Sequence, residues 1–160
     1  MADNNDNKLQ LVTFQLGAES YGIDIMIVDG IVRVEETRSI PNAPNYVDGI
    51  FNLRGEIIPI INLHKRFQIR RPELSEEDKL LSGFIIIRTS GMKLGIIIDK
   101  ISRVITVDFG KMQLPPQMLS GIGAEYIQGV FTRDEGYLIL LDIERLFDPK
   151  ELQKLGQLSS

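Results

Sequence analysis

The stretch Tyr46-Val-Asp-Gly-Ile-Phe-Asn-Leu-Arg-Gly-Glu-Ile-Ile-Pro-Ile-Ile-Asn-Leu-His-Lys-Arg-Phe67 occurs a second time, in altered form, later in the chain. It aligns without gaps on residues 126–147, with tyrosine, glycine and phenylalanine repeated at four positions. Upstream, Tyr21–Ile25 aligns in the same way on Leu94–Ile98. A unit of about 70 residues buries its apolar face poorly alone. The sequence therefore predicts two copies of one unit, packed together around a pseudo-twofold axis.

The composition favours strands. The 160 residues include 23 Ile and 8 Val but only 4 Ala, and β-branched residues fit pleated sheets whereas a helical protein carries more alanine. Short apolar runs separated by turn residues predict strands at Leu11–Leu16, Tyr21–Ile27, Ile31–Val34, Ile57–Ile61, Phe84–Ile87, Leu94–Ile98, Val104–Val107 and Tyr137–Leu141. We predict an all-β protein built as small barrels or a sandwich.

A few segments are less regular. Tyr46–Phe51 and Tyr126–Phe131 fit either a short helical turn or the start of a strand. Ser75–Asp78 has helix-capping chemistry but little apolar periodicity after it, so we predict an acidic loop between the halves. Residues Asp142–Leu155 can hold a helix that Pro149 breaks or restarts.

Composition excludes several classes of function. Without cysteine there is no thiol nucleophile or cysteine metal site, and the single histidine, His64, argues against metal centres and proton shuttles. We therefore expect no cofactor and no metal. The net charge of −4 and pI near 5.1 disfavour nucleic-acid binding. The apolar runs are too short to span a membrane, and the polar segment Met1–Asn7 does not resemble a signal peptide, so we expect a cytoplasmic protein.

The polar residues do not suggest catalysis. His64 follows an apolar strand without a second histidine or a serine elbow nearby, so we interpret it as a half-exposed strand-end residue. The acidic pairs Glu35-Glu36 and Asp134-Glu135 lie on strands or in turns, where adjacent carboxylates are solvated or point apart. We expect no enzymatic activity.

Arg54 is the charged residue of most interest. It lies in a turn between two apolar runs, next to Gly55, which suits a positive φ. It is either a solvated turn residue or a donor fork that pairs with a partner's carboxylate or backbone. Ile23–Ile31 carries apolar residues on both faces, which indicates either burial between the two copies or a groove for a partner.

The chain resembles the family of the bacterial chemotaxis coupling protein CheW, through Tyr21-Gly-Ile-Asp-Ile25, Tyr46–Leu63 and Gly95-Ile-Ile-Ile-Asp99. The resemblance runs from about Leu9 to Phe147. It implies two intertwined SH3-like five-stranded barrels with short helices at the connections and C-terminus. It also implies a single domain over residues 8–150, with lobes at about 8–75 and 80–150, and a tail or helix end at 151–160.

The resemblance further implies a non-enzymatic adaptor in two-component signal transduction. Such an adaptor joins the hairpin tips of chemoreceptors to the regulatory domain of the histidine kinase CheA, and is recruited to membrane receptor arrays without inserting into the membrane. The implied receptor-binding residues are Val12, Ile25, Val28, Ile31, Asn52, Arg54, Ile97, Ile98 and Val104. The implied kinase-binding residues are Gly49 and Ile50.

One departure from the family concerns the arginine. Asp29-Gly30 stands where many members have a larger polar or acidic residue beside the groove. The partner of Arg54 within the chain is then either absent or another carboxylate, such as Asp29 or Glu56.

Alternative functions are an oligonucleotide-binding barrel, a carboxylate enzyme, or an adaptor in a non-motility pathway.

Overall fold

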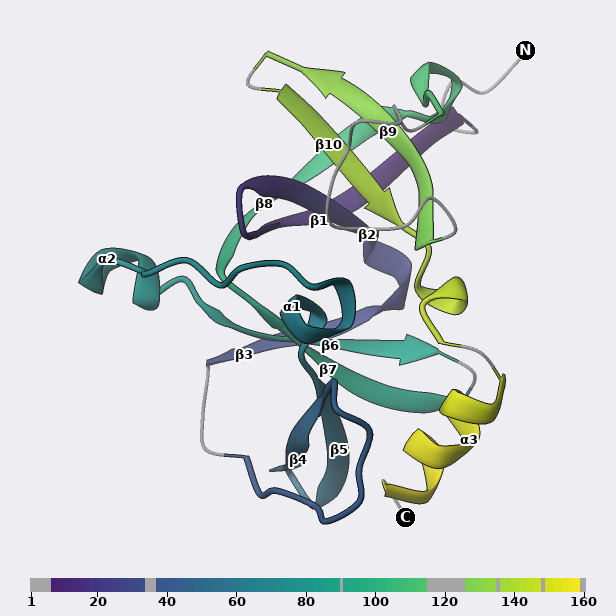
Figure 1. Ribbon diagram of the computed structural model, residues 1–160. Coiled ribbons are helices and arrows are strands. Elements are labelled where there is room, and N and C mark those ends of the chain that lie inside the picture. The colour runs from purple at the N-terminus through teal and green to yellow at the C-terminus, as the bar shows by residue number, and fades with distance from the viewer. Residues whose placement is uncertain are drawn as a thin grey trace.

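The computed structural model describes residues 7–33, 37–89, 91–114, 126–134, 136–147 and 149–158 (Figure 1). The strands are β1 (Lys8–Leu16), β2 (Glu19–Asp24), β3 (Val28–Arg33), β4 (Val47–Leu53), β5 (Glu56–Ile61), β6 (Gly83–Thr89), β7 (Met92–Ile98), β8 (Lys100–Asp108), β9 (Ile127–Arg133) and β10 (Gly136–Leu141). The helices are α1 (Leu63–Phe67), α2 (Glu76–Lys79) and α3 (Pro149–Leu158), and the short 3-10 turns are η2 (Ile25–Ile27), η3 (Phe109–Lys111) and η5 (Ile143–Arg145).

The strands form two five-stranded sheets. Sheet A has the order β8-β1-β2-β10-β9, and sheet B has the order β3-β6-β7-β5-β4. If each strand is replaced by its counterpart in the other repeat, the order of sheet A becomes that of sheet B. Each sheet also holds one parallel pair, β10 with β2 and β5 with β7. The all-β fold and the two five-stranded sheets are confirmed, and the strand order follows the repeat.

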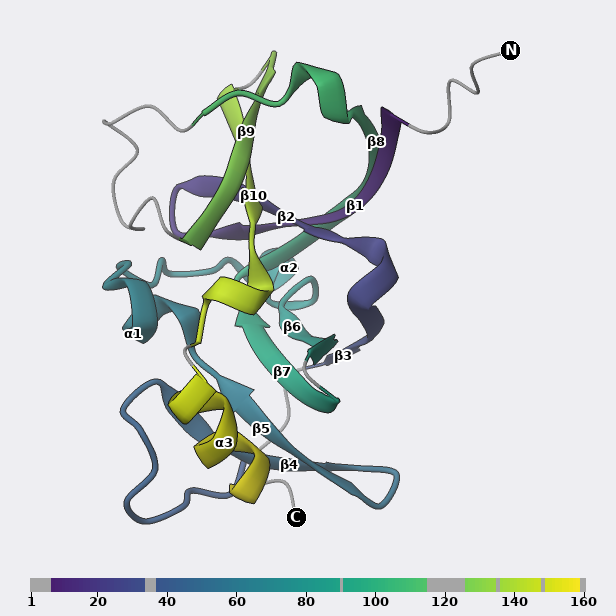
Figure 2. The same ribbon diagram turned by 90° about the vertical axis from the view of Figure 1, so that its right-hand side faces the viewer.

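The two repeats do not coincide with the two sheets, because each repeat contributes strands to both sheets. Sheet A combines β1 and β2 with β8, β9 and β10, whereas sheet B takes β3 to β7. Figures 1 and 2 show sheet A above and sheet B below, with α1 between them. The predicted lobes, 8–75 and 80–150, therefore each give strands to both sheets. Because the chain passes from sheet A to sheet B between β2 and β3, and back to sheet A between β7 and β8, the halves are intertwined.

The apolar core consists of three clusters, one within each sheet and one between them. Sheet B has its own cluster, which includes Phe51 and Ile97, and sheet A has a corresponding one, which includes Leu11 and Phe131. A larger cluster, in which Ile98 is fully buried, takes residues from both sheets and from α1. Alternate residues of β7 thus face different clusters, as the period of a strand requires.

Aromatic residues of the two repeats meet at the seam between the sheets. The ring centroids of Tyr46 and Phe147 are 5.6 Å apart, and those of their counterparts, Tyr126 and Phe67, are also 5.6 Å apart. Arg66 lies over this group, with its guanidinium carbon 5.0 Å from the Tyr46 centroid and 5.5 Å from that of Tyr126. These reciprocal pairs are what a pseudo-twofold axis produces.

Some local predictions were wrong and others were resolved. Ile25–Ile27 is a 3-10 turn and not strand, because the Asp24 side chain accepts a hydrogen bond from the Met26 backbone N–H at 3.0 Å and ends β2. Both open segments, Tyr46–Phe51 and Tyr126–Phe131, lie mainly in strands β4 and β9.

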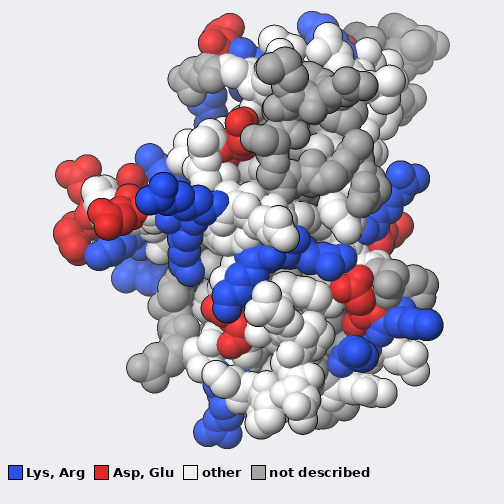
Figure 3. Space-filling model, viewed as in Figure 1, with Lys and Arg blue, Asp and Glu red and all other residues white. Residues whose placement is uncertain are grey.

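The segment Ser75–Asp78 is helical rather than a loop. The Ser75 side chain caps α2 by accepting a hydrogen bond from the Asp78 backbone N–H at 3.1 Å. The capping chemistry therefore outweighed the missing apolar periodicity. Acidic side chains gather over α2 at the left of Figure 3. At the other end of the chain, Pro149 begins α3, so of the two roles left open for this proline it starts a helix and does not break one.

In the described ranges, no helix combines the length and apolarity needed to cross a membrane.

Candidate functional site

A pocket of about 260 Å³ opens on sheet B beside the turn between β4 and β5. We call it the Arg54 pocket. It is lined by Asp29, Gly30, Ile31, Val32, Leu53, Arg54, Glu56, Ile86 and Lys93. Ile31 supplies exposed apolar surface, because half of this residue (50%) is open to solvent. The pocket thus joins apolar surface to several charged groups.

The β4–β5 turn holds Arg54 in an uncommon backbone conformation. Arg54 and Gly55 have φ angles of 54° and 89°, and Leu53 pairs with Glu56, as in a two-residue type I′ hairpin. The Asn52 side-chain oxygen accepts a hydrogen bond from the Gly55 N–H at 2.9 Å and braces the turn. A side chain at positive φ costs about 1 kcal/mol, and such strain is concentrated at functional sites.

The charges of the pocket are paired around Lys93. Lys93 Nζ lies 3.1 Å from Glu56 Oε1 and 3.1 Å from Asp29 Oδ2, while Arg88 Nε lies 2.9 Å from Asp29 Oδ1. Hydrogen bonds to Glu56, and then to Asp29, raise the pKa of Lys93 above its usual 10.5.

Arg54 forms no ion pair with any residue in the described part of the chain. Of the two possibilities left open for this arginine, a partner supplied by Asp29 or Glu56 is wrong, because both carboxylates are turned to Lys93. An exposed guanidinium beside an apolar pocket is suited to pair with a carboxylate or carbonyl of another molecule.

The predicted receptor-binding residues fall into three groups. Ile31 and Arg54 line the pocket, and Asn52 supports its turn. Val104, which is 51% exposed on β8, stands opposite Val12 of β1, while Ile25 and Val28 are partly buried.

The third group lies in the core. Val12, Ile97 and Ile98 are 5%, 3% and 0% exposed. These three residues can shape the surface by packing beneath it, but they do not present side chains to a partner.

The predicted kinase-binding residues, Gly49 and Ile50, lie in β4. The backbone of Ile50 exchanges two hydrogen bonds of 2.9 Å with that of Arg38. Gly49 is buried at φ 152°, and a Cβ there would lie 2.5 Å from the Arg38 carbonyl oxygen. Gly49 is therefore required by close backbone packing, and its contact with a partner stays a prediction.

His64 is buried, not half-exposed as predicted. It lies in α1, 4% exposed, with Nε2 2.9 Å from Asp99 Oδ1, and the other carboxylate oxygen of Asp99 accepts a hydrogen bond from the Gly17 N–H at 2.7 Å. The Asn62 side chain caps α1 and turns His64 inward. This pair ties α1 to the β1–β2 turn and to the start of β8.

The described residues were also compared with what a metal site requires. The described residues hold no group of three or more His, Asp and Glu side chains that could bind a metal ion. No local sequence pattern indicates Lys93, because its partners Asp29 and Glu56 are distant in the chain. The parallel pairing of β5 with β7 is what brings it to Glu56.

Comparisons with known proteins agree on one family. The model of the CheW-like domain matches residues 10–151. The chain is 60% identical over 154 residues to the chemotaxis protein CheW of Treponema pallidum (strain Nichols), covering 96% of this chain and 91% of the relative. It is 32% identical to part of the chemotaxis protein CheA of Borreliella burgdorferi, covering 88% of this chain and 15% of that protein.

A solved structure has the same fold. The crystal structure of the scaffolding protein TtCheW from Thermoanaerobacter tengcongensis superposes with a TM-score of 0.78 at 34% sequence identity. The match covers 89% of this chain and 90% of that one.

Proposed function

The chain belongs to the family of CheW-like domains, and we propose that its Arg54 pocket receives the cytoplasmic hairpin tip of a chemoreceptor. The protein is a non-enzymatic adaptor of bacterial chemotaxis, which acts with chemoreceptors and the histidine kinase CheA. We also propose which part of each partner is bound and which residues of this chain bind it.

One observation carries the assignment of the pocket. Arg54 is exposed on a braced type I′ turn, forms no ion pair with any described carboxylate, and lies next to the exposed side chain of Ile31. A helical hairpin binds by placing apolar residues in a groove, and a single charged anchor fixes its orientation. Since the turn already fixes the backbone of Arg54, only its side chain has to be ordered on binding.

Coupling requires a second partner at a different surface. We propose that the regulatory domain of CheA binds elsewhere on the single domain of residues 8–150, with the Gly49–Ile50 segment as one contact. The CheA relative carries a segment similar to this chain, which supports contact between like folds. Weak contacts to receptor and kinase strengthen each other when both are held in an array at the membrane. A receptor signal passes on if its signalling states bind the pocket with different free energies.

The test of this function separates charge from folding at Arg54. Arg54→Gly removes the guanidinium and also the strain of a side chain at positive φ, so the variant should fold at least as stably as the unaltered protein. We expect it to bind a purified receptor cytoplasmic fragment at least tenfold more weakly, measured by calorimetry.

Two further variants complete this test. Arg54→Lys keeps the charge but loses the fork and should bind with intermediate affinity. Lys65→Gly, which changes an exposed lysine of α1, is the control and should bind normally. Full receptor binding by Arg54→Gly would refute the assignment.

A further inference from the structure

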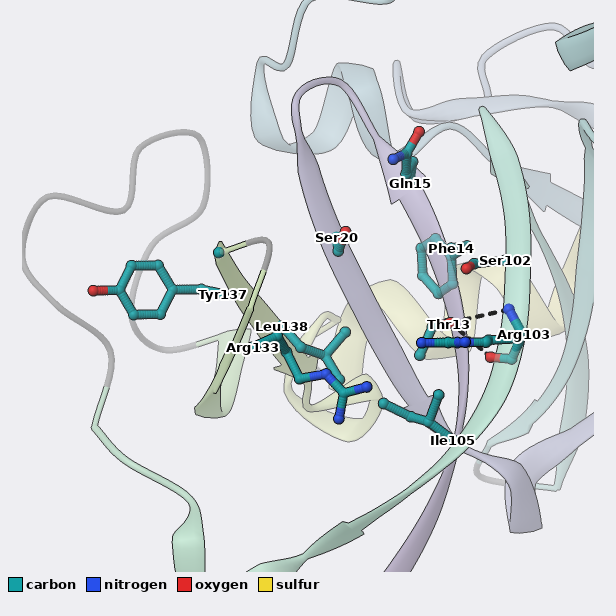
Figure 4. A pocket seen from close by; sticks show the side chains of 11 residues that line it. Thr13, Phe14, Gln15, Ser20, Ser102, Arg103, Ile105, Arg133, Tyr137 and Leu138 are labelled. Atoms are coloured by element: carbon teal, nitrogen blue, oxygen red, sulfur yellow. Dashed lines mark hydrogen bonds between the residues drawn. The ribbon is translucent and has the colours of Figure 1, made fainter.

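A second pocket, of about 140 Å³, lies on sheet A (Figure 4). Its lining residues are Thr13, Phe14, Gln15, Ser20, Ser102, Arg103, Ile105, Arg133, Gly136, Tyr137 and Leu138. They come from β1, β2, β8 and the β9–β10 turn, which are the counterparts of the elements around the Arg54 pocket. We call it the Arg103 pocket.

The strand registers show that the two pockets occupy the same place in the two repeats. Val104 of β8 pairs with Val12, as Ile31 of β3 pairs with Ile85. At the turns, Arg133 pairs with Gly136, as Leu53 pairs with Glu56. The pseudo-twofold axis that relates the sheets therefore relates the pockets.

The exposed apolar residues follow the same symmetry. Val104 is 51% exposed and its counterpart Ile31 is 50% exposed, while Tyr137 is 43% exposed and its counterpart Ile57 is 38% exposed. Tyr137 points away from the arginines of the pocket (Figure 4). Of these four residues, Ile31 lines the Arg54 pocket and Tyr137 lines the Arg103 pocket, so each pocket has an exposed apolar residue in its wall.

The charges of the pockets differ. Both carboxylates of the Arg54 pocket are replaced by neutral residues in the Arg103 pocket, where Ser102 stands for Asp29 and Gly136 stands for Glu56. Arg103 takes the place of Gly30 and Arg133 that of Leu53. The described lining of the Arg54 pocket thus contains two acids and two bases, whereas that of the Arg103 pocket contains two exposed arginines.

The backbone of Arg103 is fixed, and the guanidinium groups of Arg103 and Arg133 lie near each other (Figure 4). The Arg103 backbone is fixed by buried Thr13, whose hydroxyl donates to the Arg103 carbonyl oxygen at 2.6 Å and accepts from its N–H at 3.1 Å. The guanidinium groups of Arg103 and Arg133 point toward a common space (Figure 4). Asp134 lies in the adjoining hollow, but within the described ranges it forms no ion pair with either arginine. Like charges that converge favour an anion between them.

From these observations we infer that the Arg103 pocket is a second docking site, which binds a carboxylate-bearing segment of a partner protein while the Arg54 pocket is occupied. The inference rests on the proposed function, under which the partner that does not use Arg54 is the kinase. A polypeptide fits better than a nucleic acid, because the net charge of −4 repels a polyanion while two arginines suit one or two carboxylates.

The test measures two affinities on one set of variants. The double variant Arg103→Glu, Arg133→Glu, the variant Arg54→Glu and the control Lys111→Glu, which reverses an exposed charge on η3, are titrated with purified full-length CheA and with a receptor cytoplasmic fragment. All four sites are exposed, so each variant should keep its circular dichroism spectrum. We expect the double variant to bind CheA at least tenfold more weakly and the receptor within twofold of normal. Arg54→Glu should show the opposite pattern, and Lys111→Glu should change neither affinity.

Four results would overturn the inference. CheA binding within twofold of normal in the double variant removes the site, and loss of receptor binding in that variant makes it part of the receptor surface. A change in the protein's own oligomeric state, with CheA binding intact, makes a second copy the occupant. If the unaltered protein binds neither CheA nor the receptor, the proposed function itself fails and this inference fails with it.

Discussion

Asp29 forms its ion pair in the Arg54 pocket with Lys93, at 3.1 Å between Oδ2 and Nζ, and not with Arg54. Glu56, the other carboxylate within reach, also binds Lys93. The lysine thus occupies both acids of the pocket, and the arginine on the turn is left for another molecule.

The first prediction concerns the pKa of Lys93. Because the folded protein raises this pKa, the ion pairs favour folding below pH 10.5, and their contribution is lost as the pH rises through the raised value. Glu56→Gln removes the first cause of the shift and should lower the pKa of Lys93 toward its usual value. NMR titration of the lysine side chains measures this. An unchanged Lys93 in the variant would contradict the pairing.

The second prediction concerns Ile31. Ile31→Asp places a carboxylate at an exposed position, so we expect a stability change below about 1 kcal/mol. In the pocket, however, it offers Arg54 an anion and removes apolar surface, so affinity for the receptor fragment should fall at least tenfold. Leu80→Asp, at an exposed leucine that caps the C-terminal end of α2, is the matched control and should bind normally. Equal effects of the two changes would argue against a specific pocket.

The third prediction compares Gly49 with its counterpart Gly129. An added Cβ at Gly49 would meet the Arg38 backbone at positive φ, whereas at Gly129 it would meet the flexible Met112 side chain. Gly49→Ala should therefore lower the free energy of unfolding by about 2 kcal/mol, and Gly129→Ala should lower it less. Urea denaturation measures both. A larger loss at Gly129 would refute the packing argument.

The fourth prediction concerns the seam. Arg66 Nη2 donates to the Leu146 carbonyl oxygen at 2.9 Å and to Glu151 at 3.1 Å, besides covering the aromatic rings. Arg66→Leu should cost about 2 kcal/mol of unfolding free energy. Lys65→Leu, which removes an exposed pair with Asp48, should cost less than about 0.5 kcal/mol. Similar losses for the two variants would show that Arg66 does not join the repeats.

The repeat could be predicted from the sequence because each copy keeps the same residues where backbones approach closely or rings meet. Gly49 and Gly129, or Tyr46 and Tyr126, are such positions. The division of each repeat between the two sheets could not be predicted, since a strand's apolar pattern does not say which sheet it joins.

The site was only partly predictable for a related reason. The turn at Arg54 is a local feature, and the adjacent Gly55 predicts it from the sequence. The pairing of Lys93 with Glu56 depends on the parallel contact of β5 with β7, and the burial of His64 depends on Asp99 across the seam. Both contacts join residues far apart in the chain, so neither leaves a local pattern.

The measurement that tests the account most directly is co-sedimentation of purified CheA with membranes that carry chemoreceptors. We predict that CheA sediments with these membranes when this protein is added, and that it stays in the supernatant when Arg54→Glu or the double variant Arg103→Glu, Arg133→Glu is added instead. CheA that sediments equally well with and without the protein would contradict its role as the link between receptor and kinase.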